Sequence, residues 1–570
     1  MAITKVTGAM LGNYTGGSAD DTVVVGDGAG DAITTGTDNT LVGDNAGTAL
    51  TTGANNVAVG SSALATEDGN GYNVAIGYES LKTLNAGADA GNVAIGYQAA
   101  TLATTAAGVI AIGKSAGAAI TTGGYNTLIG NLSGDAITTG AQNVAVGAVS
   151  LTNNTTASYN TALGYNSLSA NTTGAENTGV GHGSLAATTT GSGNTAVGSG
   201  ALDANTTADD NTAMGKSALG ANTTGGNNVA VGKDALLANT TANNNTAIGL
   251  QAMKTNTTGA DNTAVGRDAL EANTTGAENT VVGKAAMEDN TTGSNNVAVG
   301  RQAMNQNTTG DKSVAIGDNA LNAATTGGYN VAVGKDAFLS LTTGTQSVAV
   351  GYKAGYDLTT GGDSTFIGHE AGTNATGGGN TCTGHRAGDS IISGTNNTIV
   401  GTASDCAHDT SHCIIIGHNV TGTDNVFRFG KASNYASSTA FTNSGDCTFS
   451  FASDERKKQN IVDETLGLEF INKLKPRTFN WRPSNEYPKE WEAYSETNTV
   501  DTEKTHHGFI AQEVKAVLDE YGVSESMDVW SEDEDGMQRV GETKFVTQLI
   551  KAVQELSAEL NELKDKVENK

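Results

Sequence analysis

A short apolar stretch returns at a fixed interval through most of the chain and ends each time at a glycine. In a representative copy the apolar Val265 directly precedes Gly266, and the β-branched Thr263 stands two positions earlier, with an alanine between them. Such period-two alternation of β-branched residues predicts a short strand. The two β-branched positions share one face of that strand, and the alanine points to the other.

The terminal glycines keep a constant step of 17, without a slip, from Gly96 to Gly368. Earlier glycines keep this step, apart from a two-residue insertion before Gly96, and later ones follow at steps of 16, 17 and 16. These further members are Gly26, Gly43, Gly60, Gly77, Gly384, Gly401 and Gly417. A fixed period of this size is typical of solenoids, in which each copy stacks only on its neighbours.

A second large apolar residue lies four positions after the glycine in many copies, for example Leu219, Met253 and Phe338. We expect it to give each coil a second inward wall, in addition to the β-branched one. A polar corner follows, typically Asn-Thr-Thr-Gly as at 256–259. Asn and Gly tolerate the left-handed backbone of such corners. Stacked coils would align the Asn and Thr side chains into hydrogen-bonded ladders.

These patterns predict an all-β repeat solenoid, a parallel β-roll or β-helix rod, over residues 21–430. A helical repeat is the rival fold, but Gly, Thr, Asn and β-branched residues are weak helix formers. At the spacing of paired strands, the series of glycines would correspond to a rod of about 115 Å. A coil as short as this repeat encloses little interior, so we expect several chains to support one another.

The composition changes near residue 450. All three prolines and all three tryptophans lie after this point, so a Gly/Thr/Asn/Ala/Val array is joined to a segment of ordinary globular composition. The 76 glycines follow no Gly-X-Y triplet, which excludes collagen. The net charge of −28 argues against binding to nucleic acid or to an anionic membrane surface.

The cellular compartment is indicated by what the sequence lacks. The first residues have no apolar core of signal-peptide length, and no stretch approaches a membrane span. The four cysteines lie late in the array and form no framework typical of secreted proteins. We therefore expect the chain to be made and folded in a reducing cytoplasm.

The strand motif resembles a known repeat. Residues 55–60 (Asn-Asn-Val-Ala-Val-Gly) and 313–317 (Ser-Val-Ala-Ile-Gly) look like the head repeats of trimeric autotransporter adhesins, which form trimeric left-handed parallel β-rolls. Phage tail fibres carry similar repeats, and the period here is longer than the usual adhesin repeat. The resemblance implies a homotrimer. An autotransporter would need a signal peptide and a C-terminal membrane barrel, which we do not recognise, and this favours a viral fibre.

Two motifs about fifty residues apart follow the array. The first is Ser-Asp-Glu-Arg-Lys-Lys at 453–458, and the second is His-Gly-Phe-Ile-Ala-Gln-Glu-Val at 507–514. Together they resemble the C-terminal intramolecular chaperone of endosialidases and other phage tail proteins. The resemblance covers residues 451–570. It implies an α+β domain that trimerises, templates the folding of the fibre and then cuts itself off.

The resemblance assigns Ser453 as the nucleophile and Lys458 as its base. A serine hydroxyl is a weak nucleophile until a base takes its proton, and a lysine can serve if burial lowers its pKa. Ser453 would attack the carbonyl of Ala452 and cut between the two residues, in a single-turnover maturation step. Asp454 and His507 would position the scissile region.

Two features leave the cleavage prediction open. A position often held by leucine in the family is Lys457 here, which leaves the efficiency of cleavage undecided. A Ser-Asp pair before basic residues is also typical of a helix N-cap with a solvated first turn. The second motif, at 507–514, is the reason to prefer cleavage.

The last segment repeats apolar residues in steps of three and four between Val546 and Val567. This heptad pattern predicts a coiled coil over 546–567. A trimeric clamp of this kind would hold the chains in register while the parallel β structure, with its costly long-range pairing, forms. The alternative is a plain helix that packs on its own domain.

A cluster of Cys406, His408, His412 and Cys413 lies late in the array. Sulfur and imidazole suit zinc, but the spacing matches no zinc motif. Packing within the β structure is the preferred interpretation, and histidines stacked on a trimer axis are the alternative. We predict no metal site and no cofactor.

We therefore predict a homotrimeric bacteriophage tail fibre, located in the virion, assembled in the host cytoplasm and without enzymatic activity apart from self-cleavage. Residues 1–20 would attach to a phage tail or baseplate protein, 21–430 would form the shaft, and 431–452 the distal tip. The tip would contact a bacterial surface receptor, either glycan or protein, and 453–570 would be the chaperone. Neither nucleic acid nor membrane insertion is expected. The alternatives are a bacterial-type trimeric adhesin without release, and an ice- or surface-binding solenoid suggested by the Thr-Thr pairs.

Overall fold

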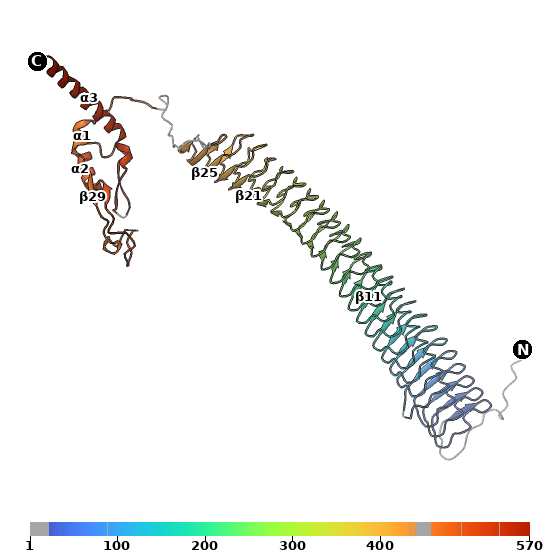
Figure 1. Cartoon of the computed structure of the whole chain (residues 1–570). Helices are drawn as coiled ribbons and strands as arrows, with labels where there is room; N and C mark the ends of the chain where they lie inside the picture. The colour runs from blue at the N-terminus through green and yellow to red at the C-terminus, as the bar shows by residue number, and fades with distance from the viewer. Residues whose placement is uncertain (1–21, 88, 433, 439–457, 492, 535) are drawn as a thin grey trace. The chain divides into compact units, whose positions relative to one another are not determined.

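Residue contacts divide the computed structural model of the chain into two units, Met1–Phe451 and Ala452–Lys570. The first unit is a β-solenoid and the second contains the helices (Figure 1). None of the helices in the described part of the chain is long and apolar enough to cross a membrane. The structure describes residues 22–87, 89–432, 434–438, 458–491, 493–534 and 536–570.

Each coil of the solenoid contributes one strand of three residues, and the strands stack in parallel along one ladder (Figure 1). In the regular part of the array, paired residues are 17 apart, as in the pairing of Thr178 with Thr195. The predicted solenoid and its period are therefore confirmed. The strands are β1 (Val23–Val25), β2 (Thr40–Val42), β3 (Val57–Val59), β4 (Val74–Ile76), β5 (Val93–Ile95), β6 (Ile110–Ile112), β7 (Thr127–Ile129), β8 (Val144–Val146), β9 (Thr161–Leu163), β10 (Thr178–Val180), β11 (Thr195–Val197), β12 (Thr212–Met214), β13 (Val229–Val231), β14 (Thr246–Ile248), β15 (Thr263–Val265), β16 (Thr280–Val282), β17 (Val297–Val299), β18 (Val314–Ile316), β19 (Val331–Val333), β20 (Val348–Val350), β21 (Thr365–Ile367), β22 (Thr381–Thr383) and β23 (Thr398–Val400).

The ladder ends in a hairpin. After β23 the ladder continues through β25 (Ile414–His418) and β27 (Phe427–Lys431), which pair in parallel. The next strand, β28 (Asn434–Ser438), runs antiparallel to β27 and so ends the parallel stacking. Two short strands, β24 (Asp405–Cys406) and β26 (Thr421–Gly422), pair in a small sheet beside the last coils.

The interior of the coil is lined differently from the prediction. In β15 the central Ala264 is fully buried, whereas Thr263 and Val265 on either side are only partly buried. The same burial pattern recurs along the array, so the β-branched residues face outward and the alanines face inward. The prediction of a β-branched inward wall is wrong. The predicted second wall is confirmed, because Leu270, four residues after Gly266, is fully buried.

The narrow interior of the coil explains this arrangement. A large side chain in the second wall leaves space only for a small one at the centre of the strand. In two coils with a large residue at the centre of the strand, the second wall is glycine: Leu128 stands against Gly134, and Phe366 against Gly372. A Cβ atom at Gly134 would lie 2.8 Å from Leu128 Cδ2. Interiors pack at the density of organic crystals, so a large residue in one wall requires a small one in the other.

The predicted Asn and Thr ladders are present. Asn177 Oδ1 accepts the backbone N–H of Asn194 in the next coil at 3.0 Å, and Asn194 Nδ2 donates to the carbonyl of Ala208 at 2.8 Å. Both asparagines are fully buried. On the corner, Thr206 Oγ1 donates to the carbonyl of Thr223 at 3.1 Å. Each coil is therefore tied to the next by side-chain as well as backbone hydrogen bonds.

The repeated glycine is required by contact between coils. Gly266 has φ +141°, which L side chains rarely adopt, and a Cβ atom there would lie 2.3 Å from the carbonyl oxygen of Gly283 in the next coil. Any side chain would push the coils apart. This contact is the physical reason for the periodic glycine in the sequence.

The second unit is a small α+β domain that ends in a long helix, as predicted. Its core contains Phe470, Leu474, Val514, Leu518, Val529 and Phe545. Its elements are α1 (Leu468–Lys473), β29 (Arg477–Phe479), η2 (Ser484–Glu486), β30 (His506–Gly508), α2 (Ala511–Glu520), β31 (Trp530–Glu532), β32 (Gln538–Val540), η3 (Glu542–Phe545) and α3 (Val546–Glu568).

Candidate assembly and cleavage site

The motif at 507–514 spans the end of β30 and the start of α2 in the C-terminal domain. The ring of Phe509 packs against that of Phe545, with 5.7 Å between centroids, and Val514 is buried. Glu513 receives two hydrogen bonds from Arg477 of β29, at 2.9 and 2.6 Å. These hydrogen bonds from Arg477 lower the pKa of Glu513. The motif therefore joins α2 to the sheet.

Gly508 of the motif leaves room for an approaching carboxylate. A Cβ atom there would lie 2.7 Å from Glu542 Oε1. The same oxygen accepts the backbone N–H of Phe509 at 3.2 Å. Since Glu542 begins η3, which leads directly into α3, this contact fixes the start of the terminal helix on the motif.

One face of α3 packs on its own domain. Glu555 Oε2 accepts the backbone N–H of Leu468 at the start of α1, at 2.7 Å, and so caps that helix. Gln548 Nε2 donates to Glu464 Oε2 at 2.8 Å. Gln548 and Ala552 are the buried residues of α3. The roles of Glu542 and Glu555 are not visible in the sequence, because a lone glutamate on a helix carries no signal of its long-range partner.

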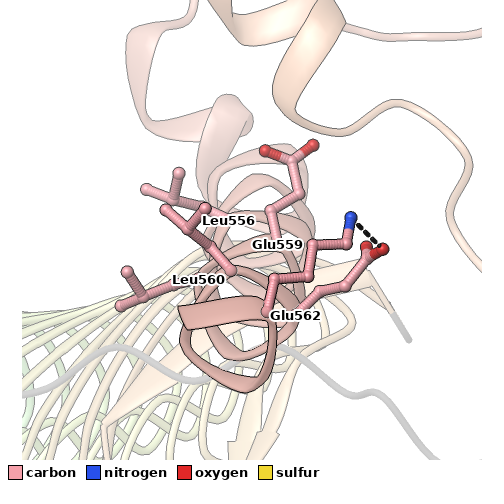
Figure 2. Close-up of a pocket in the computed structure, with 6 residues that line it drawn as sticks. Leu556, Glu559, Leu560 and Glu562 are labelled. Carbon is pink, nitrogen blue, oxygen red and sulfur yellow. Dashed lines mark ion pairs between the residues drawn. The ribbon is translucent and has the colours of Figure 1, made fainter. Parts of the chain in front are cut away.

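The predicted heptad residues lie on a different face of α3. Figure 2 shows Leu556 and Leu560 on one side of the helix, away from Glu559 and Glu562. All seven residues of this seam, which we call the α3 seam, are 47% to 67% exposed. They are Val546, Leu549, Val553, Leu556, Leu560, Leu563 and Val567. The helix therefore packs on its domain without using the seam, and a coiled-coil partner for the seam stays a prediction.

The predicted cleavage residues are only partly described. Ala452, Ser453 and Asp454 lie outside the described residues, so the geometry of nucleophile and base stays a prediction. Lys458 is exposed. His507 is also exposed, on β30 opposite Thr478 of β29.

The outward face of the solenoid carries a second exposed apolar row. The residue before each terminal glycine points away from the coil, and several of these side chains are 36% to 46% exposed. They include Ile76, Leu163, Met214, Ile248, Val282, Ile316, Val350, Ile367, Val400 and Ile416. Contiguous apolar surfaces of this kind mark interaction sites in soluble proteins.

The late cysteine and histidine cluster is not arranged as a metal site. A disulfide joins Cys406 to Cys413, so neither sulfur is available as a thiolate ligand. His369 and His385 stack on each other, with 5.3 Å between ring centroids. Within the described ranges, no three His, Cys, Asp or Glu side chains converge as ligands. Of the two other cysteines, Cys447 lies outside the described residues, whereas Cys382 is buried, and burial raises the pKa of its thiol.

Comparison with protein families identifies the C-terminal domain. Residues 453–523 match the family described as the chaperone of endosialidase (peptidase S74). The predicted resemblance to endosialidase-type chaperones is therefore confirmed for this part of the chain. The molecule combines a parallel β-solenoid with a C-terminal chaperone domain of this type, which is the organisation of a tail-fibre-like protein. Comparisons with curated proteins and with solved structures find no match.

Proposed function

We propose that this protein is a homotrimeric bacteriophage tail fibre whose C-terminal domain directs assembly and then releases itself by autoproteolysis. The observation that carries the proposal is the α3 seam, an unpartnered heptad row on a domain that matches the endosialidase chaperones. A single chain leaves this row in water. Heptad seams of Leu and Val are covered by equivalent helices in coiled coils.

The outward face of the solenoid supports the same assembly. Its apolar row extends along the array, with exposed members from β9 to β25. A long, flat and apolar sheet face is an aggregation hazard unless it is covered. Three identical shafts, arranged in parallel around one axis, would each direct this face inward. The thin interior of each coil, lined mostly by alanine, then gains a second core between the chains.

The cleavage chemistry would be a rearrangement followed by hydrolysis. The Ser453 hydroxyl oxygen would bond to the carbonyl carbon of Ala452 as Lys458, in its neutral form, takes the hydroxyl proton. The Ala452–Ser453 C–N bond would break, and the released amine of Ser453 would take a proton. Water would then hydrolyse the ester and leave a carboxylate on Ala452. Since Lys458 is exposed in the single chain, its burial would come from partner chains, which would make cleavage follow trimerisation.

The location in the virion and the contact with a host receptor follow from the tail-fibre class. The N-terminal segment would attach to a tail or baseplate protein, and the region up to Ala452 would become the distal tip after release. A glycan or a protein on the bacterial surface would be the receptor.

A denaturing gel of the purified full-length product tests the proposal. Cleavage after Ala452 divides the 57.4 kDa chain into a fragment 1–452, with about four fifths of the mass, and a fragment 453–570, with about one fifth. Ser453→Ala and Lys458→Ala should each leave a single full-length band, whereas the controls Ser450→Ala and Lys457→Ala should still be cut. Sedimentation equilibrium of the Ser453→Ala protein should give three times the chain mass. Cleavage of the Ser453→Ala chain would exclude the proposed nucleophile, and a monomer would exclude the fibre.

A further inference from the structure

Two columns of exposed residues bound the outward face of the solenoid. One column stands five residues before each terminal glycine, just ahead of the strand, and the other directly follows the glycine. In the middle of the array the first column, here called the acidic edge, carries Glu176, Asp210, Asp261 and Glu278. The second column, the basic edge, carries Lys216, Lys233, Arg267, Lys284, Arg301 and Lys335. This basic column stands out in a chain with a net charge of −28.

The signs of the two edges are correlated within individual coils. From the coil of Gly215 to that of Gly334, four coils carry a charge at both edges, and the two signs are opposite in every one. These four pairs are Asp210 with Lys216, Asp261 with Arg267, Glu278 with Lys284, and Lys312 with Asp318. The coil of Gly317 has the opposite arrangement, with the positive charge on the acidic edge and the negative charge on the basic edge. Outside this stretch, the coils of Gly26 and Gly43 depart from the pattern, since both edges are acidic in each of them (Asp21 and Asp27, Asp38 and Asp44).

Among the described residues, no ion pair joins the two members of a pair within one chain. They stand six residues apart on either side of a three-residue strand, a span of at most about 20 Å. Basic-edge residues do make local ion pairs, such as Arg267 with Asp268 at 3.0 Å and Arg301 with Asp318 at 2.9 Å. Those contacts give individual charged side chains a partner within their own chain. They do not explain why the sign at one edge follows the sign at the other.

A ring of parallel chains brings the two edges together. Each interface in a cyclic assembly is heterologous, so the acidic edge of one copy faces the basic edge of the next. We propose that these edges pair coil by coil between neighbouring copies and so set the register of the three shafts. The inference rests on the trimer proposed above and adds how its chains are aligned.

Register is a physical problem for this shaft because the coils are nearly identical. A slip by one coil would bury almost the same apolar surface, so the β-branched face alone cannot exclude it. The inverted coil removes this ambiguity. In register, Lys312 faces Asp318 of the next copy, whereas a slip in either direction places it opposite Arg301 or Lys335. Like charges at the interface act against the wrong alignment.

Four variants of the full-length chain, made in the Ser453→Ala background, test the inference. The first reverses the basic edge (Lys216→Glu, Arg267→Glu, Lys284→Glu) and the second the acidic edge (Asp210→Lys, Asp261→Lys, Glu278→Lys). The third combines both sets. The fourth is the control Asp31→Lys, Asp203→Lys, Asp289→Lys, which has the charge change of the second set away from both edges. Lysine is compatible with the left-handed backbone of the acidic edge, since Lys312 there has φ 56°.

The readouts are the trimer fraction by sedimentation and the melting midpoint by circular dichroism at low ionic strength. Each single-edge set should lower the midpoint by about 5 °C or more, while the combined set and the control stay within about 2 °C of the parent. In about 1 M salt, where the screening length is about 3 Å, the decrease in midpoint of each single-edge set should become smaller. Swapping one coil alone, Asp261→Lys with Arg267→Glu, should also restore the midpoint relative to either change by itself.

The outcomes separate the two proposals. If the parent protein sediments as a monomer, the trimer itself is wrong. The parent could be a trimer while the combined set lowers the melting midpoint by as much as the two single-edge sets added together. In that case the trimer stands and edge pairing is wrong. A one-coil swap that does not restore the midpoint contradicts pairing within the same coil.

Discussion

The buried asparagine ladder offers the most direct test of what holds the solenoid together. Asn194 is fully buried and connects three coils. Its backbone N–H donates to Asn177 Oδ1 at 3.0 Å, its Nδ2 donates to the carbonyl of Ala208 at 2.8 Å, and its Oδ1 accepts the backbone N–H of Asn211 at 3.0 Å. Asn194→Ala removes the last two of these bonds without touching the backbone ladder. It also removes three bonds of 3.1 to 3.2 Å, to Asn177 Oδ1, the Ser192 carbonyl and Asn211 Nδ2, whose partner groups each keep another hydrogen bond.

The expected cost follows from which groups lose a partner. The buried N–H of Asn211 loses its side-chain acceptor, which costs about 2 kcal/mol. The carbonyl of Ala208 keeps a second donor, Asn205 Nδ2 at 3.1 Å, so the loss of the other bond adds only about 1 kcal/mol. Asn194→Ala should therefore lower the local free energy of unfolding by about 3 kcal/mol per chain. Asn194→Ser should cost about 1 kcal/mol, because Ser313 Oγ in the same column accepts the N–H of Asn330 at 3.1 Å.

Hydrogen exchange is the suitable assay, because a long array of repeats does not unfold in a single two-state step. With about 1.4 kcal/mol for each factor of ten, exchange protection of the amides around 195–211 should fall by about 100-fold in Asn194→Ala. The control Asn131→Ala changes an exposed asparagine in a column where Ala148 occurs naturally, and protection should stay unchanged. Protection in Asn194→Ala within about threefold of the parent would refute the role assigned to the ladder.

Three further predictions concern the second wall, the α3 anchor and the last coils. Leu219→Ala, at a fully buried position, should lower local stability by about 2–5 kcal/mol in the same exchange assay, whereas Leu102→Ala, at a position 50% exposed, should have little effect. Glu555→Ala removes the cap of α1 and should lower the stability of the C-terminal domain by about 1 kcal/mol in a thermal melt, whereas Glu562→Ala removes only an exposed ion pair with Lys566 and should leave it unchanged. Burial, together with the neighbouring Asp389, raises the pKa of Asp405 to about 6. Because the folded state then binds more protons than the unfolded state, the stability of the last coils should fall as pH rises from about 4 to about 6 and level off above; Asp405→Asn should flatten that profile, and an unchanged profile would contradict the assignment.

Much of the fold was predictable because the solenoid is built from local rules. The glycine period determines the length of a coil, since each glycine contacts the next through a gap too narrow for a Cβ atom. Alternation of β-branched residues determines where the strands lie, and the buried leucines of the second wall follow from their spacing. The family of the C-terminal domain was likewise readable from the motif at 507–514, whose Gly508, Phe509 and Glu513 all make specific contacts.

Long-range contacts in the C-terminal domain were not predictable. Arg477 meets Glu513, and Leu468 meets Glu555, across 36 and 87 residues of chain. No periodicity connects such partners, because they are brought together by the packing of α1, α2 and α3. The same packing separates the face of α3 that contacts its own domain from the exposed α3 seam. The heptad pattern alone did not decide whether the seam or another face of the helix makes that contact.

Which face of each strand points into the coil was also decided by the tertiary structure. Period-two alternation predicts that Ala264 and Val265 point to opposite sides of the strand. It does not indicate which side is the interior. The width of the closed coil decides this, because Leu270 in the opposite wall leaves space only for a small residue. The sequence alone therefore determined the period, the strands and the chaperone domain. The closed coil determined that the β-branched residues face outward, where a second copy of the chain can cover them.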